Sequence, residues 1–117
     1  MEYDFEKLIV WKKAMELTEE IYKETKNFPH DEKFGLTSQL RRAASSVPAN
    51  IAEGKGRHFT KEYVHFLYIA RGSCYEVITF LKLSQKLRYT NANDAERLLK
   101  GSWDVAGGLN GLINALK

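Results

Sequence analysis

The chain has 117 residues, of which 44% are hydrophobic and 28% are charged, and its formal net charge is +3. This length suits a single domain over residues 1–117, and this composition excludes the class of disordered tails. The chain contains no run of 18 apolar residues and no signal-peptide pattern at its acidic N-terminus, so we expect a cytoplasmic protein without a membrane partner.

Apolar residues recur at helical spacing near the start of the chain and predict a first helix from about Phe5 to Asn27, with Asp4 as its N-cap. Two neighbouring apolar seams share this helix, one formed by Leu8, Trp11, Met15 and Tyr22 and the other by Val10, Ala14, Leu17 and Ile21. Phe28 stands before Pro29 and is therefore biased away from helical geometry, so the helix should end there.

A second helix is predicted from about Glu32 to Glu53, ended by Gly54 and Gly56. Its core side consists of apolar residues three and four positions apart, namely Leu36, Leu40, Ala43, Ala44, Val47 and Ile51. The opposite side carries mostly small residues, which would let another backbone come close.

Pro48 interrupts this pattern and allows two interpretations. It removes the hydrogen bond to the carbonyl of Ala44, so the helix is expected to kink near Ser45. Alternatively, Ser46 caps a fresh short helix that has Pro48 in its first turn.

A third helix, capped by Thr60, should continue to about Leu87. Its inner face consists of Tyr63, Phe66, Leu67, Ala70, Cys74, Val77, Ile78 and Leu81. Its outer face is also apolar, with Tyr68, Ile69, Tyr75, Phe80, Leu83 and Leu87 projecting away from that stripe. A helix that is apolar on most sides is usually buried on most sides, so we interpret these six residues as an oligomer interface rather than as scattered surface residues.

A fourth helix is predicted from near Asn93, which forms a capping-box-like pair with Glu96, toward Leu116. Its core face is formed by Ala95, Leu98, Ser102, Val105, Ala106, Leu109, Leu112, Ile113 and Leu116. Four glycines, Gly101, Gly107, Gly108 and Gly111, lower the helix propensity of this segment. They indicate either fraying or tight packing against a neighbour.

The residue patterns of several enzyme classes are incomplete. Glu62 and His65 form one E-x-x-H pair, but a carboxylate-bridged metal bundle needs two such pairs and two further glutamates, so we predict no metal site. The GKGR turn at residues 54–57 lacks the strand and the GK[ST] ending of a nucleotide-binding loop. The single cysteine, Cys74, lies on a core face and is expected to be a buried structural thiol. We therefore expect no cofactor, no catalytic residue and no enzymatic activity.

Positive charge is concentrated in the middle of the chain, where residues 31–89 carry ten lysines and arginines against five acids. Lys55, Arg57, His58 and Lys61 gather within seven residues at one predicted end of the bundle and are candidates for phosphate contacts. The alternative is an ordinary solvated basic loop.

Two further groups of cations are candidates for polyanion binding. Arg71 alternates with Tyr68, Tyr75 and Lys82 along the third helix, which suits stacked bases or, equally, a subunit interface with cation–π contacts. Arg41 and Arg42 could contact phosphate, although Arg41 flanks the core and could instead pair with an acid.

Three stretches occur in the order FEKLIVWKKA, FGLTSQLRRAASSVPANIAEGKGR and EYVHFLYIARGSCYE. Together they resemble the bacterial four-helix-bundle family named for proteins encoded in intervening sequences of 23S ribosomal RNA genes, over essentially the whole chain. A related group is similar to the accessory protein of diversity-generating retroelements. The resemblance implies an all-α, antiparallel up-and-down four-helix bundle that assembles into a homo-oligomeric ring, a homopentamer, with nucleic-acid contacts and no catalytic residues.

These observations predict a nonenzymatic oligomeric scaffold that binds RNA or DNA through basic surface residues. The candidate contacts are Arg41, Arg42, Lys55, Arg57, His58, Lys61 and Arg71. The alternative is a protein-interaction module, for example a partner of a polymerase or reverse transcriptase, that does not bind nucleic acid directly.

Overall fold

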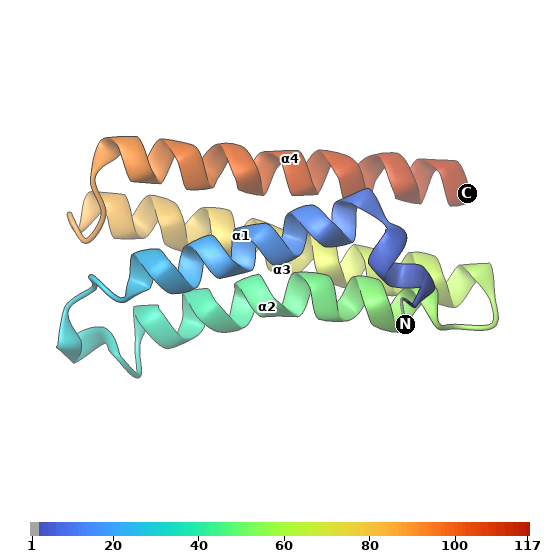
Figure 1. Ribbon diagram of the computed structural model, residues 1–117, viewed down its shortest axis with the longest axis horizontal. Helices are drawn as coiled ribbons and strands as arrows, with labels where there is room; N and C mark the ends of the chain where they lie inside the picture. Colours follow the sequence, from blue (N-terminus) through green and yellow to red (C-terminus); the bar gives the residue numbers. More distant parts are fainter. Residues whose placement is uncertain (1–2) are drawn as a thin grey trace.

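The structure is a computed structural model that describes residues 3–117 as an elongated bundle of helices, with principal extents of 43 × 24 × 22 Å. Short 3-10 turns, η1 (Asp4–Lys7) and η2 (His30–Glu32), accompany four long helices, which are α1 (Ile9–Thr25), α2 (Leu36–Lys55), α3 (Thr60–Lys86) and α4 (Ala92–Leu116). The four helices lie side by side, and the chain reverses direction at each of the three connections between them (Figure 1). No strand occurs over residues 3–117, so the prediction of an all-α fold with four helices is confirmed.

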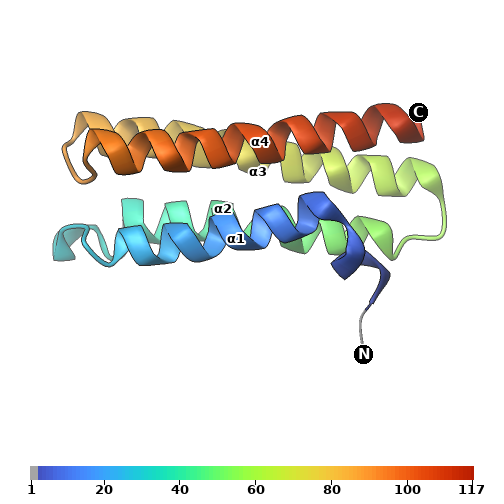
Figure 2. The ribbon, with the colours of Figure 1, turned by 45° about the horizontal axis from the view of Figure 1, so that its top comes forward.

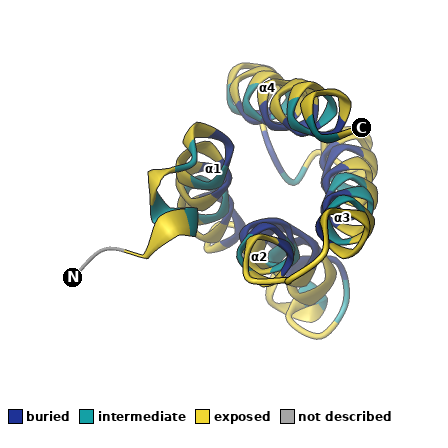
Figure 3. Ribbon diagram, turned by 90° about the vertical axis from the view of Figure 1, so that its right-hand side faces the viewer, coloured by how far each residue is buried: buried dark blue, intermediate teal, exposed yellow. Residues whose placement is uncertain are grey.

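One hydrophobic core runs the length of the bundle, and the buried residues of all four helices face it (Figure 3). The predicted core stripe of α2 is entirely buried, from Leu36 to Ile51. The predicted faces of α3 and α4 are buried except for Phe66, Leu112 and Leu116, which are partly exposed. Burial of these side chains is the main stabilising contribution to the fold.

The two predicted seams of α1 differ in burial. Val10, Ala14, Leu17 and Ile21 are buried, as predicted. In the other seam, Leu8 and Trp11 pack partly buried against the core, whereas Met15 is 45% exposed and Tyr22 is 42% exposed, so this seam is only partly buried. The contact between α1 and α4 is less extensive than the contact between α2 and α3, so part of the α1 surface stays in contact with water.

The starts of α1 and α4 differ from the sequence predictions. Asp4 does not cap α1, because it belongs to the η1 turn and Leu8 has an extended backbone that separates this turn from the helix. The cap of α4 is Asn91 rather than Asn93, since the Asn91 side chain accepts a hydrogen bond from the Asp94 amide at 2.8 Å. Several neighbouring polar residues can cap a helix, and only the backbone conformation selects among them.

The start of α2 lies four residues after the predicted Glu32, and α3 differs from the prediction in its cap. Thr60 is the first residue of α3, and Phe59 precedes it with an extended backbone. Glu32 precedes α2 by four residues, and its carboxylate accepts a hydrogen bond from the Leu36 amide at 3.0 Å. A second carboxylate oxygen of Glu32 accepts from the Tyr89 hydroxyl at 2.9 Å, which ties the start of α2 to the residues that follow α3.

Pro48 lies inside α2, which is one continuous helix from Leu36 to Lys55. The alternative of a fresh short helix capped by Ser46 is therefore wrong. The Thr18 hydroxyl of α1 lies 3.1 Å from the carbonyl oxygen of Ala44, the group that loses its helical donor to the proline, and 2.8 Å from the Ala14 carbonyl oxygen. Pro48 thus leaves an acceptor that a side chain of the neighbouring helix partly satisfies.

Gly54 lies where α2 and α3 approach closely. A Cβ atom added at this position would lie 2.8 Å from Cβ of Phe66 and 3.1 Å from the carbonyl oxygen of Tyr63. The Tyr63 contact is with backbone, which cannot rotate away as a flexible side chain would. Glycine is therefore required here for packing.

We predict that Gly54→Ala destabilises the protein by about 1–3 kcal/mol, because the added methyl group overpacks the contact between α2 and α3. Chemical denaturation monitored by circular dichroism measures this change. Gly107→Ala is the matched control: nothing lies within 4 Å of a Cβ there, so the same substitution should stabilise α4 by up to about 1 kcal/mol. Equal effects of the two substitutions would contradict the packing role of Gly54.

The hydrogen bonds to Glu32 predict a pH dependence of stability. The Leu36 amide, and secondly the Tyr89 hydroxyl, lower the pKa of Glu32 from its ordinary value of 4.5. A carboxyl with a lowered pKa in the folded state stabilises the fold fully above the unfolded-state pKa, and this contribution is lost as pH falls through the folded-state pKa.

We expect the melting temperature of Glu32→Gln to change less than that of the wild type as pH is lowered below about 4.5, because the titrating group is removed. Tyr89→Phe removes one of the two hydrogen bonds and should give an intermediate pH dependence. Thermal melts followed by circular dichroism supply the measurement, and indistinguishable profiles for wild type and Glu32→Gln would refute the assignment.

Candidate nucleic-acid interface

The connection between α2 and α3 turns at one end of the bundle (Figures 1 and 2). It carries a group of cations, which we call the basic turn. It consists of Lys55, Arg57, His58 and Lys61, and all four residues are exposed. These residues are close in sequence, and the helix boundaries at Lys55 and Thr60 keep them at the same end of the molecule. Their side chains can thus reach a common ligand.

Contacts within the chain engage two of these cations. Arg57 pairs with Glu53 at 2.5 Å, and its guanidinium lies 4.6 Å from the ring centroid of Phe66. Lys55 Nζ lies 5.7 Å from the ring centroid of Tyr63. Within the described part of the chain, neither Lys55 nor Lys61 forms an ion pair, so their charges remain available to an external anion.

Phe59 lies among the residues of the basic turn, and the sequence analysis did not identify it as a candidate. Its side chain is 64% exposed, and its ring packs edge-on against that of His58 with centroids 4.7 Å apart. Phe59 stands outside the periodic apolar stripe of α3 and between the cations Arg57 and Lys61 in the sequence. An aromatic residue in such a position is the signal that could have identified it. An exposed ring next to positive charges offers a nucleobase a stacking surface.

Arg41 is held against α1 and pairs with no acid of residues 3–117. Its Nε donates to the Thr25 hydroxyl oxygen at 2.8 Å, and Nη2 donates to the Tyr22 carbonyl oxygen at 3.3 Å. The guanidinium also lies 4.7 Å from the ring centroid of Tyr22. Two of its five N–H donors are thus directed to the C-terminal end of α1, where backbone carbonyls lack helical partners.

Arg42 is exposed and lies away from the basic turn. It lines a polar cleft between α2 and α3 together with Gln39, Ala43, Ser46, Ser73 and Glu76. Thirteen positions of the same helix separate Arg42 from Lys55, which corresponds to about 20 Å at the α-helical rise. The structure therefore does not bring the arginines of α2 together with the basic turn.

Arg71 lies half-buried between α3 and α4, among aromatic rings. Its Nη1 donates to the side-chain oxygen of Asn110 at 2.9 Å, and its guanidinium lies 4.8 Å from the ring centroid of Tyr68 and 5.9 Å from that of Tyr75. Trp103 continues this row from α4, with its ring centroid 6.3 Å from that of Tyr75. Sequence reasoning missed Asn110 and Trp103, because only the packing of α4 on α3 brings them to Arg71.

The six predicted interface residues do not share one exposed face. Tyr68 and Phe80 are partly buried against the core of their own chain, so the expectation that they lie outside it is wrong. Ile69, Leu83 and Leu87 are 39%, 43% and 46% exposed, and Tyr75 is 41% exposed. Tyr68 and Tyr75 lie on the side of α3 that faces α4, while helical spacing places Ile69, Leu83 and Leu87 on another side.

The remaining candidate reactive groups are Cys74, Glu62 and His65. The Cys74 thiol is buried beside the Ser102 carbonyl oxygen at 3.1 Å, and burial raises its pKa to about 11. It is therefore protonated at neutral pH. Glu62 and His65 are exposed on α3, and over residues 3–117 no three His, Cys, Asp or Glu side chains are placed to hold a metal ion. None of the described helices combines the length and apolarity needed to cross a membrane.

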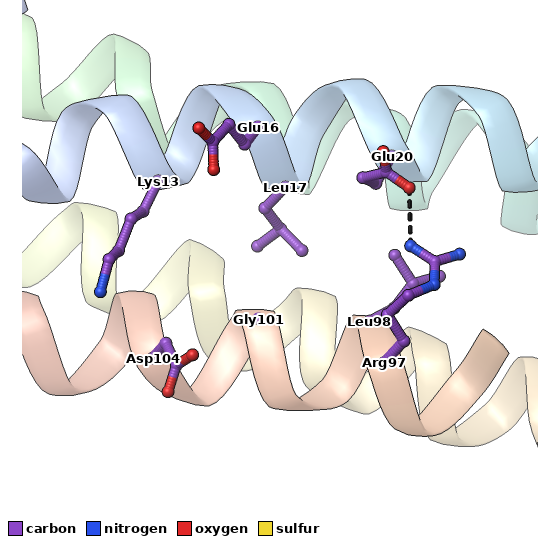
Figure 4. A pocket seen from close by; sticks show the side chains of 8 residues that line it. All are labelled: Lys13, Glu16, Leu17, Glu20, Arg97, Leu98, Gly101 and Asp104. Carbon is purple, nitrogen blue, oxygen red and sulfur yellow. Dashed lines mark hydrogen bonds and ion pairs between the residues drawn. The ribbon is translucent and has the colours of Figure 1, made fainter. Parts of the chain in front are cut away.

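A pocket of about 220 Å³ lies between α1 and α4 (Figure 4). The ion pair of Glu20 and Arg97, at 2.6 Å, spans one end of it. Its other lining residues are Lys13, Glu16, Leu17, Leu98, Gly101 and Asp104. Three carboxylates against two cations make this pocket unsuitable for a polyanion.

Comparison with known proteins identifies the family of this chain. Residues 6–111 match the family described as 23S rRNA-intervening sequence protein. The chain is also similar to a crystal structure from Bacteroides thetaiotaomicron, described as a protein with unknown function from the S23 ribosomal protein family. That structure shares 24% sequence identity and a TM-score of 0.81, with 90% of this chain and 98% of the other chain covered, which supports the helical fold. A search of curated proteins found no match. Because the family match spans most of the sequence, the chain belongs to the 23S rRNA-intervening sequence protein family.

Proposed function

We propose that this protein is a nonenzymatic, self-associating scaffold that binds nucleic acid, RNA or DNA, through basic surface residues. The observation that carries the proposal is the basic turn, where Lys55 and Lys61 are exposed without ion pairs among the described residues and the Phe59 ring is exposed beside them. Lysines attract phosphates, and an exposed ring accepts a base. The family description, which refers to 23S rRNA intervening sequences, agrees with a nucleic-acid setting.

Self-association would strengthen this binding. Ile69, Leu83 and Leu87 are exposed aliphatic residues of α3, and contact with a second copy would remove them from water. In the proposed assembly, antiparallel bundles with α2 bent at Pro48 form a homopentameric ring in the cytoplasm. Several basic turns would then act on one ligand, and their electrostatic fields would add.

We predict that neutralising the basic turn with Lys55→Gln, Arg57→Gln and Lys61→Gln weakens nucleic-acid binding and flattens its salt dependence. Each lost phosphate contact should lower the slope of log K against log salt by about 0.7–0.9. Fluorescence anisotropy of a labelled oligonucleotide, measured across a salt series, gives both quantities.

The matched control replaces three exposed lysines of the α1 region, Lys12, Lys13 and Lys26, and so changes the net charge equally at another place. This control should retain the wild-type slope. If both triple variants behave alike, only net charge matters and the basic turn is not a site. If the wild type binds no oligonucleotide even at about 50 mM salt, the nucleic-acid role fails and protein–protein interaction becomes the better interpretation.

We predict that Leu83→Glu combined with Leu87→Glu reduces the assembly to smaller species, because two charges would be buried in an apolar contact. Light scattering coupled to size-exclusion chromatography measures the mass, and circular dichroism verifies folding. Met15→Glu is the control, since Met15 has a similar exposed fraction of 45% on α1. A wild-type chain that is monomeric at high concentration would exclude the proposed self-association.

A further inference from the structure

We infer that the seam between α3 and α4 binds the unpaired bases of a single-stranded nucleic acid. This inference rests on the proposed nucleic-acid function. It adds a second binding surface and a preference for single strands over duplexes. We call the surface the aromatic track and define it by Tyr68, Arg71, Tyr75, Trp103 and Lys117. Its rings and cations alternate across the two helices.

The track is already ordered in the free protein. Lys117 Nζ lies 5.5 Å and the Arg71 guanidinium 4.8 Å from the ring centroid of Tyr68, so two cations contact one ring. The hydrogen bond from Arg71 to Asn110, at 2.9 Å, fixes the guanidinium between Tyr68 and Tyr75. Side chains that are held before binding lose less conformational entropy when a ligand arrives.

Two rings of the track are exposed. Tyr75 is 41% exposed and Trp103 is 54% exposed, and they come from different helices with ring centroids 6.3 Å apart. Aromatic rings and guanidinium planes are the groups on which proteins stack unpaired bases. A duplex hides the faces of its bases in its own stack, so the rings can contact only a single strand or a strand end.

The charge along the seam is complementary to a polyanion. Beyond Trp103 the seam continues as a shallow groove lined by Lys82, Gln85, Lys86 and Leu99, which meets a second hollow lined by Gln85, Ala92, Glu96, Leu99 and Lys100. Glu96 is the single carboxylate in these linings. Over residues 3–117, no ion pair neutralises Arg71 or the three lysines.

These charges favour a polyanion over a second copy of the chain as the occupant. If the seams of two copies met, lysines would face lysines with too few acids to compensate, and this arrangement is costly. The exposed aliphatic residues that suit a subunit contact, Ile69, Leu83 and Leu87, lie on a different side of α3. The seam and the proposed contact between copies are therefore separate surfaces.

The length of the seam sets the length of strand that it can hold. Tyr68 and Lys86 are 18 positions apart on α3, which corresponds to about 27 Å at the α-helical rise. At a spacing of about 3.4 Å per stacked nucleotide, this distance accommodates about eight nucleotides. Affinity should therefore rise with strand length up to about eight nucleotides and then level off, apart from statistical effects.

The test uses the full chain with Tyr75→Ala and Trp103→Ala together, titrated into labelled, unstructured single strands of about 12 nucleotides and into the matched duplex. We expect a loss of single-strand affinity of about tenfold or more, with an unchanged salt slope because no cation is removed. Duplex binding, which depends on the basic turn, should not change. RNA and DNA strands of one sequence are titrated in parallel. A preference for RNA and a preference for DNA both agree with the inference.

Tyr22→Ala is the matched control. Tyr22 is 42% exposed and lies 4.7 Å from the guanidinium of Arg41, so it reproduces the pairing of ring and arginine away from the α3–α4 seam. This variant should bind single strands as the wild type does. Arg71→Gln should instead reduce the salt slope by about one.

A second readout follows the tryptophan directly. In a Trp11→Phe background, Trp103 is the only tryptophan, and stacking of a base on its ring should quench its fluorescence. Unchanged Trp103 emission at saturating single strand would overturn the inference.

The outcomes also separate this inference from the proposed function. One outcome rejects the track and leaves the proposed function standing. In this outcome the wild type binds nucleic acid, the triple variant of the basic turn loses binding, and the double variant of the track keeps it. A double variant with an altered molecular mass identifies the seam as a subunit contact and also rejects the track. If the wild type binds neither strand nor duplex, both proposals fail.

Discussion

The packing of α2 against α3 is the contact on which the rest of the structure depends. Three interactions fix the two helices along their length: the close approach of Gly54 to Phe66 at one end, the 2.9 Å hydrogen bond between Ser46 and Ser73 near the middle, and the hydrogen bond between Glu32 and Tyr89 at the other end. Polar contacts at defined positions fix the register of an apolar interface, which by itself tolerates sliding. This register determines where the basic turn stands and which residues of α3 face outward.

The orientation of α3 gives three of its sides different environments. One side is buried in the core, a second meets α4 through Arg71 and Tyr75, and a third leaves Leu83 and Leu87 in contact with water. In the function proposed above, the second side contacts a ligand and the third side contacts a neighbouring copy. The apolar residues of α3 that its own bundle leaves exposed are the basis of that proposal.

Three arginines in the described part of the chain lie over aromatic rings, but their availability to a ligand differs. Arg41 donates to Thr25 and to a backbone carbonyl, and Arg57 is paired with Glu53. Arg71 donates to the neutral amide of Asn110. The hydrogen-bond partners of Arg71, like those of Arg41, therefore leave the positive charge uncompensated, whereas Glu53 compensates that of Arg57. The same side chain and the same stacking geometry therefore have different electrostatic consequences, which depend on the third group that the tertiary structure supplies.

The sequence by itself determined the all-α fold, the core stripes of α2, α3 and α4, the burial of Cys74 and the grouping of Lys55, Arg57, His58 and Lys61. These features depend on helical periodicity or on neighbours in sequence, which are local properties. The tertiary structure decided the cap at Asn91, the hydrogen bond from the Leu36 amide to Glu32, and the engagement of Arg41 with α1. It also decided the meeting of Arg71 and Tyr75 with Asn110 and Trp103. The reason is that a helical pattern shows which face of a helix is buried, but not how far each helix is rotated and shifted against its neighbour, and this rotation selects the residues that meet.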